Sequence, residues 1–78
     1  YLAEIVIYCN NRTGLLVDFT KVFTERKIDV QSVNSRTSKQ GIATIAMSFE
    51  VPGKDTLNYL IERIRQIESV VDIERTTG

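Results

Sequence analysis

The chain is 78 residues long, which is enough for one small domain and too short for two. Ten lysines and arginines balance ten aspartates and glutamates, so no strong field attracts nucleic acid or an anionic membrane. Histidine is absent, the single cysteine excludes an internal disulfide, and no apolar stretch approaches the ~20 residues that a membrane-spanning helix needs.

The first predicted element is a strand over residues 1–8, where the sequence pattern has a period of two and successive side chains point to opposite faces of the strand. Ile5 to Ile7 are all β-branched, which favours extended backbone. The alternation puts Cys9 on the same face as Ile5 and Ile7. We therefore expect a buried thiol, which suits a reducing compartment.

A polar loop, residues 10–14, separates this strand from a predicted helix that runs from Leu15 to about Lys27. Thr13 or Gly14 can cap the start of the helix, and the cations at its end suit the negative pole of the helix dipole. The apolar positions recur at i, i+1, i+4, i+7 and i+8 and form one helical face. They are Leu15, Leu16, Phe19, Val22 and Phe23.

The rest of the chain contains a strand pair, a helix and a last strand. The first strand of the pair covers residues 28–37, and the odd spacing of Val30 and Val33 indicates a β-bulge. A turn over residues 38–41, with Gly41 able to take a positive φ, leads into a cleanly alternating strand over residues 42–51. The second helix is marked by apolar residues between positions 57 and 67, and the last strand covers residues 69–76.

The predicted order is therefore βαββαβ, an α+β fold. Right-handed crossovers and the central hairpin leave one compact solution, the ferredoxin-like plait, with a four-stranded antiparallel sheet and both helices on one face. The other sheet face receives no cover from this chain, and it carries Val6, Tyr8, Ile42 and Ala46. Exposed apolar sheet surface marks a partner site, so we expect a homodimer or packing against neighbouring domains.

The residues that carry most enzyme chemistry are missing. There is no histidine for base catalysis, no cysteine pair for a metal, and no phosphate-binding glycine loop. Asp72 and Glu74 alternate on a strand and are interpreted as a solvated face. The sequence accordingly predicts no catalytic residue, no metal site and no cofactor, and this chain by itself is not expected to be an enzyme.

The loop Asn10–Gly14 has two interpretations. Its residue types suit a strand-to-helix turn, because asparagine tolerates left-handed backbone, threonine caps and glycine allows a tight approach. The same loop also places free backbone N–H groups at a helix start, where a carboxylate ligand would be stabilised. Asn11 could then bind the ammonium group of a zwitterion, while Leu15 and Leu16 contact its side chain.

The pattern Asn11-Arg12-Thr13-Gly14-Leu15-Leu16 before a helix resembles the Asp/Asn-Arg-x-Gly-Leu-Leu opening of ACT domains, which share the βαββαβ order. Residues 33–37, the turn at residues 39–40, residues 43–47 and the closing residues 70–75 are similar to the C-terminal ACT domain of RelA/SpoT-type (p)ppGpp synthetases/hydrolases. The resemblance covers the whole chain. It implies a single regulatory domain, residues 1–78, excised from the C-terminus of a longer cytoplasmic bacterial GTP pyrophosphokinase.

The resemblance also implies a role and a site. Members of the family commonly bind amino acids between paired domains, and branched-chain amino acids are the ligands suggested for the Rel type. The module would thereby modulate (p)ppGpp synthesis or hydrolysis by the upstream catalytic domains of the same chain. The contacts implied by the family are Asn11, Arg12, Thr13, Gly14 and Leu15, with Asp29 or Val30 from the facing copy. The flanking positions Asn10 and Leu16 are included in the predicted site.

Two alternatives remain open at this point. The chain could be an interaction module that contacts ribosomal RNA or neighbouring domains through its bare sheet or its hairpin, with Arg12, Lys21, Arg36 and Lys39 meeting phosphates. It could also act as a dimerisation scaffold without a small-molecule ligand. The neutral net charge argues against strong autonomous RNA binding.

Overall fold

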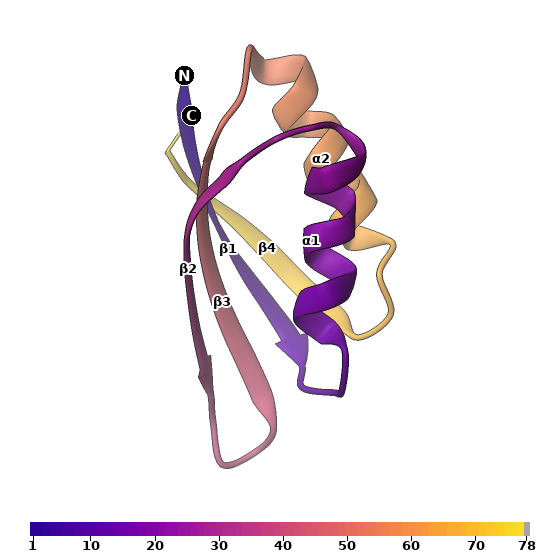
Figure 1. Ribbon diagram of the computed structural model, residues 1–78. Coiled ribbons are helices and arrows are strands. Elements are labelled where there is room, and N and C mark those ends of the chain that lie inside the picture. Colours follow the sequence, from indigo (N-terminus) through magenta and orange to yellow (C-terminus); the bar gives the residue numbers. More distant parts are fainter. Residues whose placement is uncertain (78) are drawn as a thin grey trace.

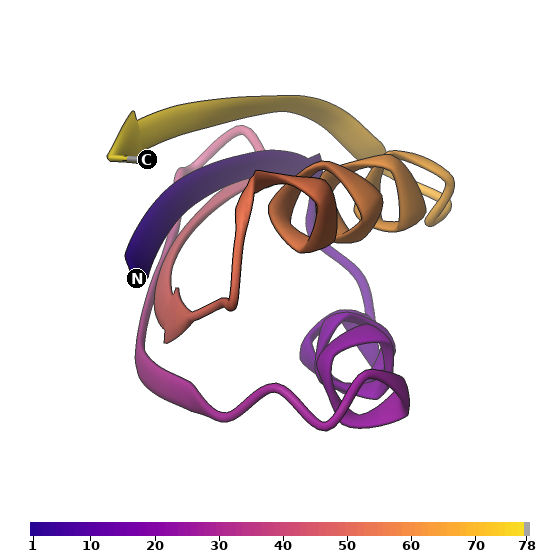
Figure 2. The same cartoon turned by 90° about the horizontal axis from the view of Figure 1, so that it is seen from above.

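The computed structural model describes residues 1–77, and it confirms the predicted ferredoxin-like plait. The antiparallel sheet has the strand order β2-β3-β1-β4, and both helices lie on the same side of it (Figures 1 and 2). The elements are β1 (Leu2–Asn10), α1 (Leu15–Glu25), β2 (Val30–Thr37), β3 (Ile42–Glu50), α2 (Lys54–Arg65) and β4 (Val70–Thr77).

The core lies between the central strands and the two helices. Alternate residues of β1 and β3 are buried there and pair directly across the strands, as Ile5 does with Met47 and Ile7 with Ile45. Phe23 of α1 meets Phe49 of β3 edge to face, with ring centroids 4.8 Å apart. The period-two and helical patterns of the sequence are thus both satisfied by one apolar layer.

Two details of the second strand were predicted correctly and one boundary was not. The register of β2 against β3 shifts between Val30 and Ser32, as expected for a bulge, and Gly41 in the hairpin turn has φ +83°. The strand begins at Val30 rather than at Ile28. Lys27 adopts φ +57° and the Ile28 N–H donates to the Phe23 carbonyl (2.9 Å), so Ile28 terminates α1 instead of starting the strand.

The far side of the sheet is covered by neither helix (Figure 1). We call this side the open face. Its central strands present side chains that are half-buried, including the four named from the sequence: Val6, Tyr8, Ile42 and Ala46. No helix among residues 1–77 is long and apolar enough to cross a membrane.

Candidate functional site

The loop that follows β1 is fixed at both sides by other connections of the fold. The Asn10 N–H donates to the Ser69 carbonyl (2.8 Å), just before β4, and the Asn11 N–H donates to the Gly41 carbonyl (2.9 Å) of the hairpin. Residues far apart in the sequence therefore set the position at which α1 begins. The start of the loop is therefore anchored to the hairpin and to the connection before β4.

Gly14 is the N-cap residue of α1, and its backbone shows why glycine is needed there. It adopts φ +79°, a left-handed conformation that side chains disfavour, and no side chain caps the helix. Of the two predicted caps, Gly14 occupies the position and Thr13 does not. A Cβ atom at Gly14 would meet nothing within 4 Å, so the space above the helix start is open.

The first turn of α1 leaves backbone donors available. The Leu15 N–H makes a long hydrogen bond to the Arg12 carbonyl (3.4 Å), and the Asp18 N–H donates to the Gly14 carbonyl (3.1 Å). Between them, the N–H groups of Leu16 and Val17 have no backbone acceptor within residues 1–77. They are the donors that a helix start offers to an anion, with the positive pole of the helix dipole behind them.

A hollow of about 240 Å³ adjoins this helix start. Ile45 belongs to its floor and is buried, whereas the side chains of Leu16 and Val17 are 43% and 56% exposed. A volume of this size suits a small metabolite rather than a nucleotide, since drug-sized ligands occupy ~300–1,000 Å³. The lining residues are Asn11, Arg12, Gly14, Leu15, Leu16, Val17, Ser35 and Ile45.

Arg12 has a positioning contact that the sequence did not indicate. Its Nη2 lies 2.6 Å from Asp18 Oδ2, and its Nε and Nη2 donate to the Glu68 carbonyl at 3.4 and 3.3 Å. A further bond runs from Nη1 to the Thr13 carbonyl (3.2 Å). The guanidinium thus ties the loop to the first turns of α1 and to the connection before β4.

The structure brings together five of the nine predicted site residues at the hollow: Asn11, Arg12, Gly14, Leu15 and Leu16. Asn10 and Thr13 do not line it: Asn10, expected in the loop, is the last residue of β1 and pairs with Ile42, and Thr13 remains in the loop. Asp29 and Val30 lie at the opposite end of the sheet, because Val30 pairs with Phe49 and Phe49 with Ala3. Ala3 precedes Asn10 by seven residues, or about 23 Å of strand, so Asp29 and Val30 can reach a hollow only in another copy.

Three lining residues were missed from the sequence, namely Val17, Ser35 and Ile45. A signal for Ser35 was present, because alternation along β2 puts it on the helix side, opposite Ile45 in the register. Its hydroxyl adds an acceptor and a donor next to the apolar side chain of Ile45.

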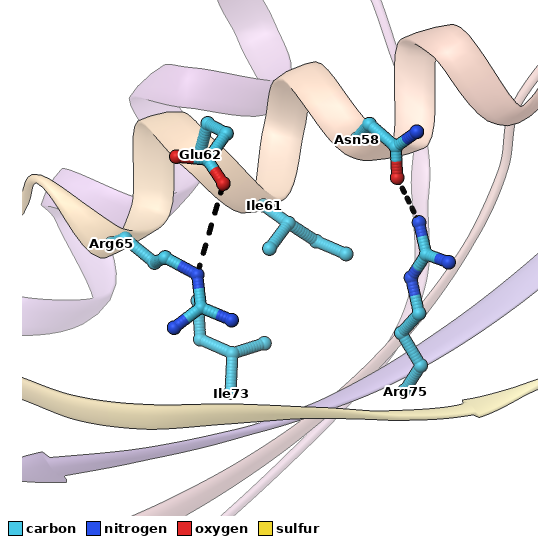
Figure 3. A pocket seen from close by; sticks show the side chains of 6 residues that line it. All are labelled: Asn58, Ile61, Glu62, Arg65, Ile73 and Arg75. Carbon is cyan, nitrogen blue, oxygen red and sulfur yellow. Dashed lines mark hydrogen bonds and ion pairs between the residues drawn. The ribbon is translucent and has the colours of Figure 1, made fainter.

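A second hollow, of about 370 Å³, lies between α2 and β4 (Figure 3). Ile61 and Ile73 form its apolar part. Its polar side chains bind one another: Arg75 donates to Asn58, and Arg65 Nε lies 4.0 Å from Glu62 Oε1. With those groups already engaged, this hollow offers less to a ligand than the one at the start of α1.

Cys9, at the end of β1, is fully buried below the loop. Burial raises the pKa of its thiol, and the positive charge of Arg12 only partly offsets this. The Sγ atom faces the Ala43 carbonyl at 3.7 Å. A neutral, enclosed thiol of this kind is a core residue rather than a nucleophile.

The βαββαβ sheet and its first strand–helix connection define a small ferredoxin-like α+β domain. The sequence profile of the ACT domain matches residues 1–75, and the chain belongs to the ACT domain family of regulatory modules.

Named relatives and a solved structure agree with this assignment. The chain is 33% identical over 79 residues to the GTP pyrophosphokinase of Escherichia coli K12 and 35% identical over 73 residues to that of Haemophilus influenzae. These matches cover 100% and 92% of this chain but only 11% and 10% of the relatives. The crystal structure of the ACT domain from the GTP pyrophosphokinase of Chlorobium tepidum matches with a TM-score of 0.82, 25% identity and 96% coverage of both chains.

Proposed function

We propose that this chain is the amino-acid-sensing module of a GTP pyrophosphokinase of the stringent response. It would be a C-terminal segment of a longer cytoplasmic protein, and it would bias (p)ppGpp synthesis or hydrolysis by upstream catalytic domains. The proposal draws on the relatives' names for the parent activity and on the family for the regulatory role. Coupling of this kind is a difference in ligand affinity between two catalytic states, typically ~1–3 kcal/mol.

One observation carries the ligand site, namely the open space above the Gly14 cap next to the free N–H groups of Leu16 and Val17. A carboxylate placed there would gain charge-assisted hydrogen bonds and a favourable interaction with the helix dipole. The side-chain oxygens of Asn11 and Ser35 would accept hydrogen bonds from the ammonium group of the same ligand.

The apolar lining sets the class of amino acid. Leu15, Leu16, Val17 and Ile45 surround the hollow with aliphatic side chains, and its volume is small. An aliphatic, branched side chain would bury its methyl groups there, whereas a charged one would lose hydration without a partner. In a paired arrangement, the carboxylate of Asp29 from a facing copy would add a counter-charge for the ammonium group.

Calorimetric titration of the 78-residue chain with L-valine, L-isoleucine and L-leucine tests the proposal. We expect saturable heat and a rise in melting temperature at millimolar ligand or below. Asn11→Ala and Ser35→Phe, which remove a polar contact and fill the hollow, should abolish both signals. Lys54→Ala, at the start of α2 and far from the hollow, is the matched control. Absence of heat and of a thermal shift with all three amino acids would contradict the proposal.

The RNA-binding alternative receives less support from the charge distribution. Arg12, one of its proposed phosphate contacts, is already paired with Asp18. The open face, which was one of its proposed contact surfaces, carries more carboxylates than cations among its described strand residues. Ribosome binding that depends on salt and is lost in Arg36→Glu would nevertheless favour that alternative.

A further inference from the structure

The strand registers arrange the open face in rows that run across all four strands. β1 pairs with β3 and with β4, and β2 pairs with β3. These three registers place one residue of each strand side by side in every row. The first row is Arg36, Thr44, Tyr8 and Asp72, and the second is Asn34, Ala46, Val6 and Glu74. The pKa of Tyr8 is raised by the Glu74 carboxylate, by burial and by Asp72, which agrees with their placement on one face.

The two halves of this face have opposite shapes. The β2–β3 half contains a hollow of about 390 Å³ lined by Asn34, Arg36, Thr44 and Ala46. The β1–β4 half presents larger side chains at the same levels, with Tyr8 in the first row and Val6 in the second.

The two halves also differ in charge. The β1–β4 half carries the carboxylates of Glu4, Asp72 and Glu74. On the β2–β3 half, Arg36 is the cation that the described strands place on this face. Glu50 lies at the rim, at the end of β3. One half therefore has a hollow and a cation, and the other carries larger side chains and carboxylates. Such a surface is complementary to itself.

We propose that the open face binds a second copy of this chain, face to face, about a two-fold axis that runs parallel to the strands between β1 and β3. This axis places Arg36 over Asp72 of the second copy and Asn34 over Glu74 of the second copy. Tyr8 and Val6 then enter the hollow of the other copy, over its Thr44 and Ala46. Each contact occurs twice, as in every isologous interface.

The direction of the axis follows from the carboxylates. An axis across the strands, through the second row, would place Glu74 opposite Glu74 of the second copy. It would also leave Arg36 opposite Ser32 of the second copy. The axis along the strands instead gives Asp72 a donor in Arg36 and Glu74 a donor in the Asn34 amide. Glu4, which accepts from Thr76 of its own chain, lies opposite the neutral Ser48 of the second copy. Like charges placed opposite each other disfavour a complex, so the charges select the parallel axis.

The dimensions of a stacked pair of sheets allow these contacts. Face-to-face sheets pack about 10 Å apart and rotate by about 30° relative to each other. Small residues at the centre, such as Ala46, permit that approach, and the long side chain of Arg36 spans the offset that the rotation produces at the sheet edge. Four strands cover only about 19 Å in width, so the interface is at the small end of specific ones, and its dissociation constant should be micromolar.

This inference does not depend on the proposed ligand site. The open face and the hollow at the start of α1 lie on opposite sides of the sheet, which the helix-side position of Ser35 and Ile45 shows. Either proposal can therefore fail without the other.

Sedimentation equilibrium of the 78-residue chain tests the pairing through charge reversal. The wild type should dimerise with a micromolar dissociation constant. Arg36→Asp and Asp72→Arg should each be monomeric at the same concentration, because each homodimer would then join like charges at both symmetry-related contacts. An equimolar mixture of the two variants should form heterodimers, because each contact between the variants again joins an arginine to an aspartate. Lys21→Asp, a charge reversal on α1, should dimerise like the wild type.

Three results would overturn the proposal: a wild type that stays monomeric at hundreds of micromolar, a dimer that survives in both single variants, or a mixture that stays monomeric. Circular dichroism of each single variant confirms that it is folded. The double variant Arg36→Asp/Asp72→Arg provides a second readout that does not depend on mixing, and it should recover dimerisation by itself.

Discussion

Arg12 and Asp18 form the ion pair that fastens the first loop onto helix α1, with Nη2 2.6 Å from Oδ2. The same guanidinium reaches the Glu68 carbonyl, which is 56 residues away along the chain. A single side chain therefore connects the loop, the helix and the segment before β4. Arg12, which the family pattern suggests as a ligand contact, thus directs its guanidinium to the protein's own acceptors.

We predict that Arg12→Ala lowers the free energy of unfolding by about 1 kcal/mol, and that Asp18→Asn lowers it by less. The two side chains are 31% and 38% exposed, so solvent screens the pair and its own coupling should be ~0.5 kcal/mol. The remainder of the Arg12 effect comes from the lost hydrogen bonds to the Glu68 carbonyl. Urea unfolding of the two variants and the double variant measures this coupling. Fully additive effects would show that the pair contributes nothing.

Gly14 should be sensitive to a single methyl group for reasons of backbone conformation alone. Gly14→Ala is expected to lower the free energy of unfolding by about 1–2 kcal/mol, because an L-residue is strained at φ +79°. No steric clash contributes, since an added Cβ meets nothing within 4 Å.

Gly53 is the matched control for that substitution. It also precedes a helix and also has open space at its Cβ position, but its φ is −175°, which any residue adopts. Gly53→Ala should therefore be neutral or slightly stabilising in the same urea experiment. Equal losses in the two variants would contradict the assignment of the Gly14 effect to its left-handed backbone.

Tyr59 joins the two helices through both of its ends. Arg26, at the end of α1, lies over its ring with Cζ 3.8 Å from the centroid, and Arg63 Nη1 donates to its hydroxyl oxygen at 3.0 Å. We expect Tyr59→Ala to lower the free energy of unfolding by about 2 kcal/mol, from lost burial and the lost cation–π contact. Tyr59→Phe keeps the ring and should lose at most ~0.5–1 kcal/mol. Similar losses in both variants, measured by thermal and urea unfolding, would assign the stabilisation to the hydroxyl.

The fold was predictable because each buried face imposes its period on the sequence. Ile5, Ile7, Ile45 and Met47 alternate with partly exposed residues, and this alternation predicts two strands with one face in the core. Val33, one of the two apolar residues on which the predicted bulge was based, is 44% exposed. A local pattern does not reveal that β2 is an edge strand whose helix side is left partly uncovered.

The lining of the hollow at the start of α1 was predictable only where its residues are neighbours in the sequence. The loop and first turn, from Asn11 to Leu16, follow from helix-start chemistry. Ser35 and Ile45 complete the hollow through strand pairing, and the Arg12 contact to Glu68 depends on the packing of the β4 connection. Element ends were missed for a similar reason, because the positive φ of Lys27 and Ser69 is not encoded by a glycine.

Two tyrosines should ionise in a defined order, since their surroundings shift the pKa in opposite directions. The Arg63 hydrogen bond, aided by Arg26, lowers the pKa of Tyr59, and the Glu74 carboxylate beside Tyr8 raises the pKa of that phenol. In a spectrophotometric titration of the folded chain, Tyr59→Phe should therefore remove the component that ionises first, and Tyr8→Phe a component above the ordinary value near 10.

The same shifts predict opposite effects on stability at high pH. A raised pKa means that the folded state holds the proton more tightly, so the contribution of Tyr8 is present below its unfolded pKa near 10 and is lost as the pH rises through its folded value. The lowered pKa of Tyr59 gives a contribution that is present above the unfolded pKa and is lost as the pH falls through the folded value. Urea unfolding as a function of pH should show a shallower loss of stability above pH 10 for Tyr8→Phe than for the wild type. Tyr59→Phe should instead lack the gain in stability that Tyr59 contributes as the pH rises from its lowered folded pKa to the unfolded pKa near 10. Parallel curves for all three proteins would refute both assignments.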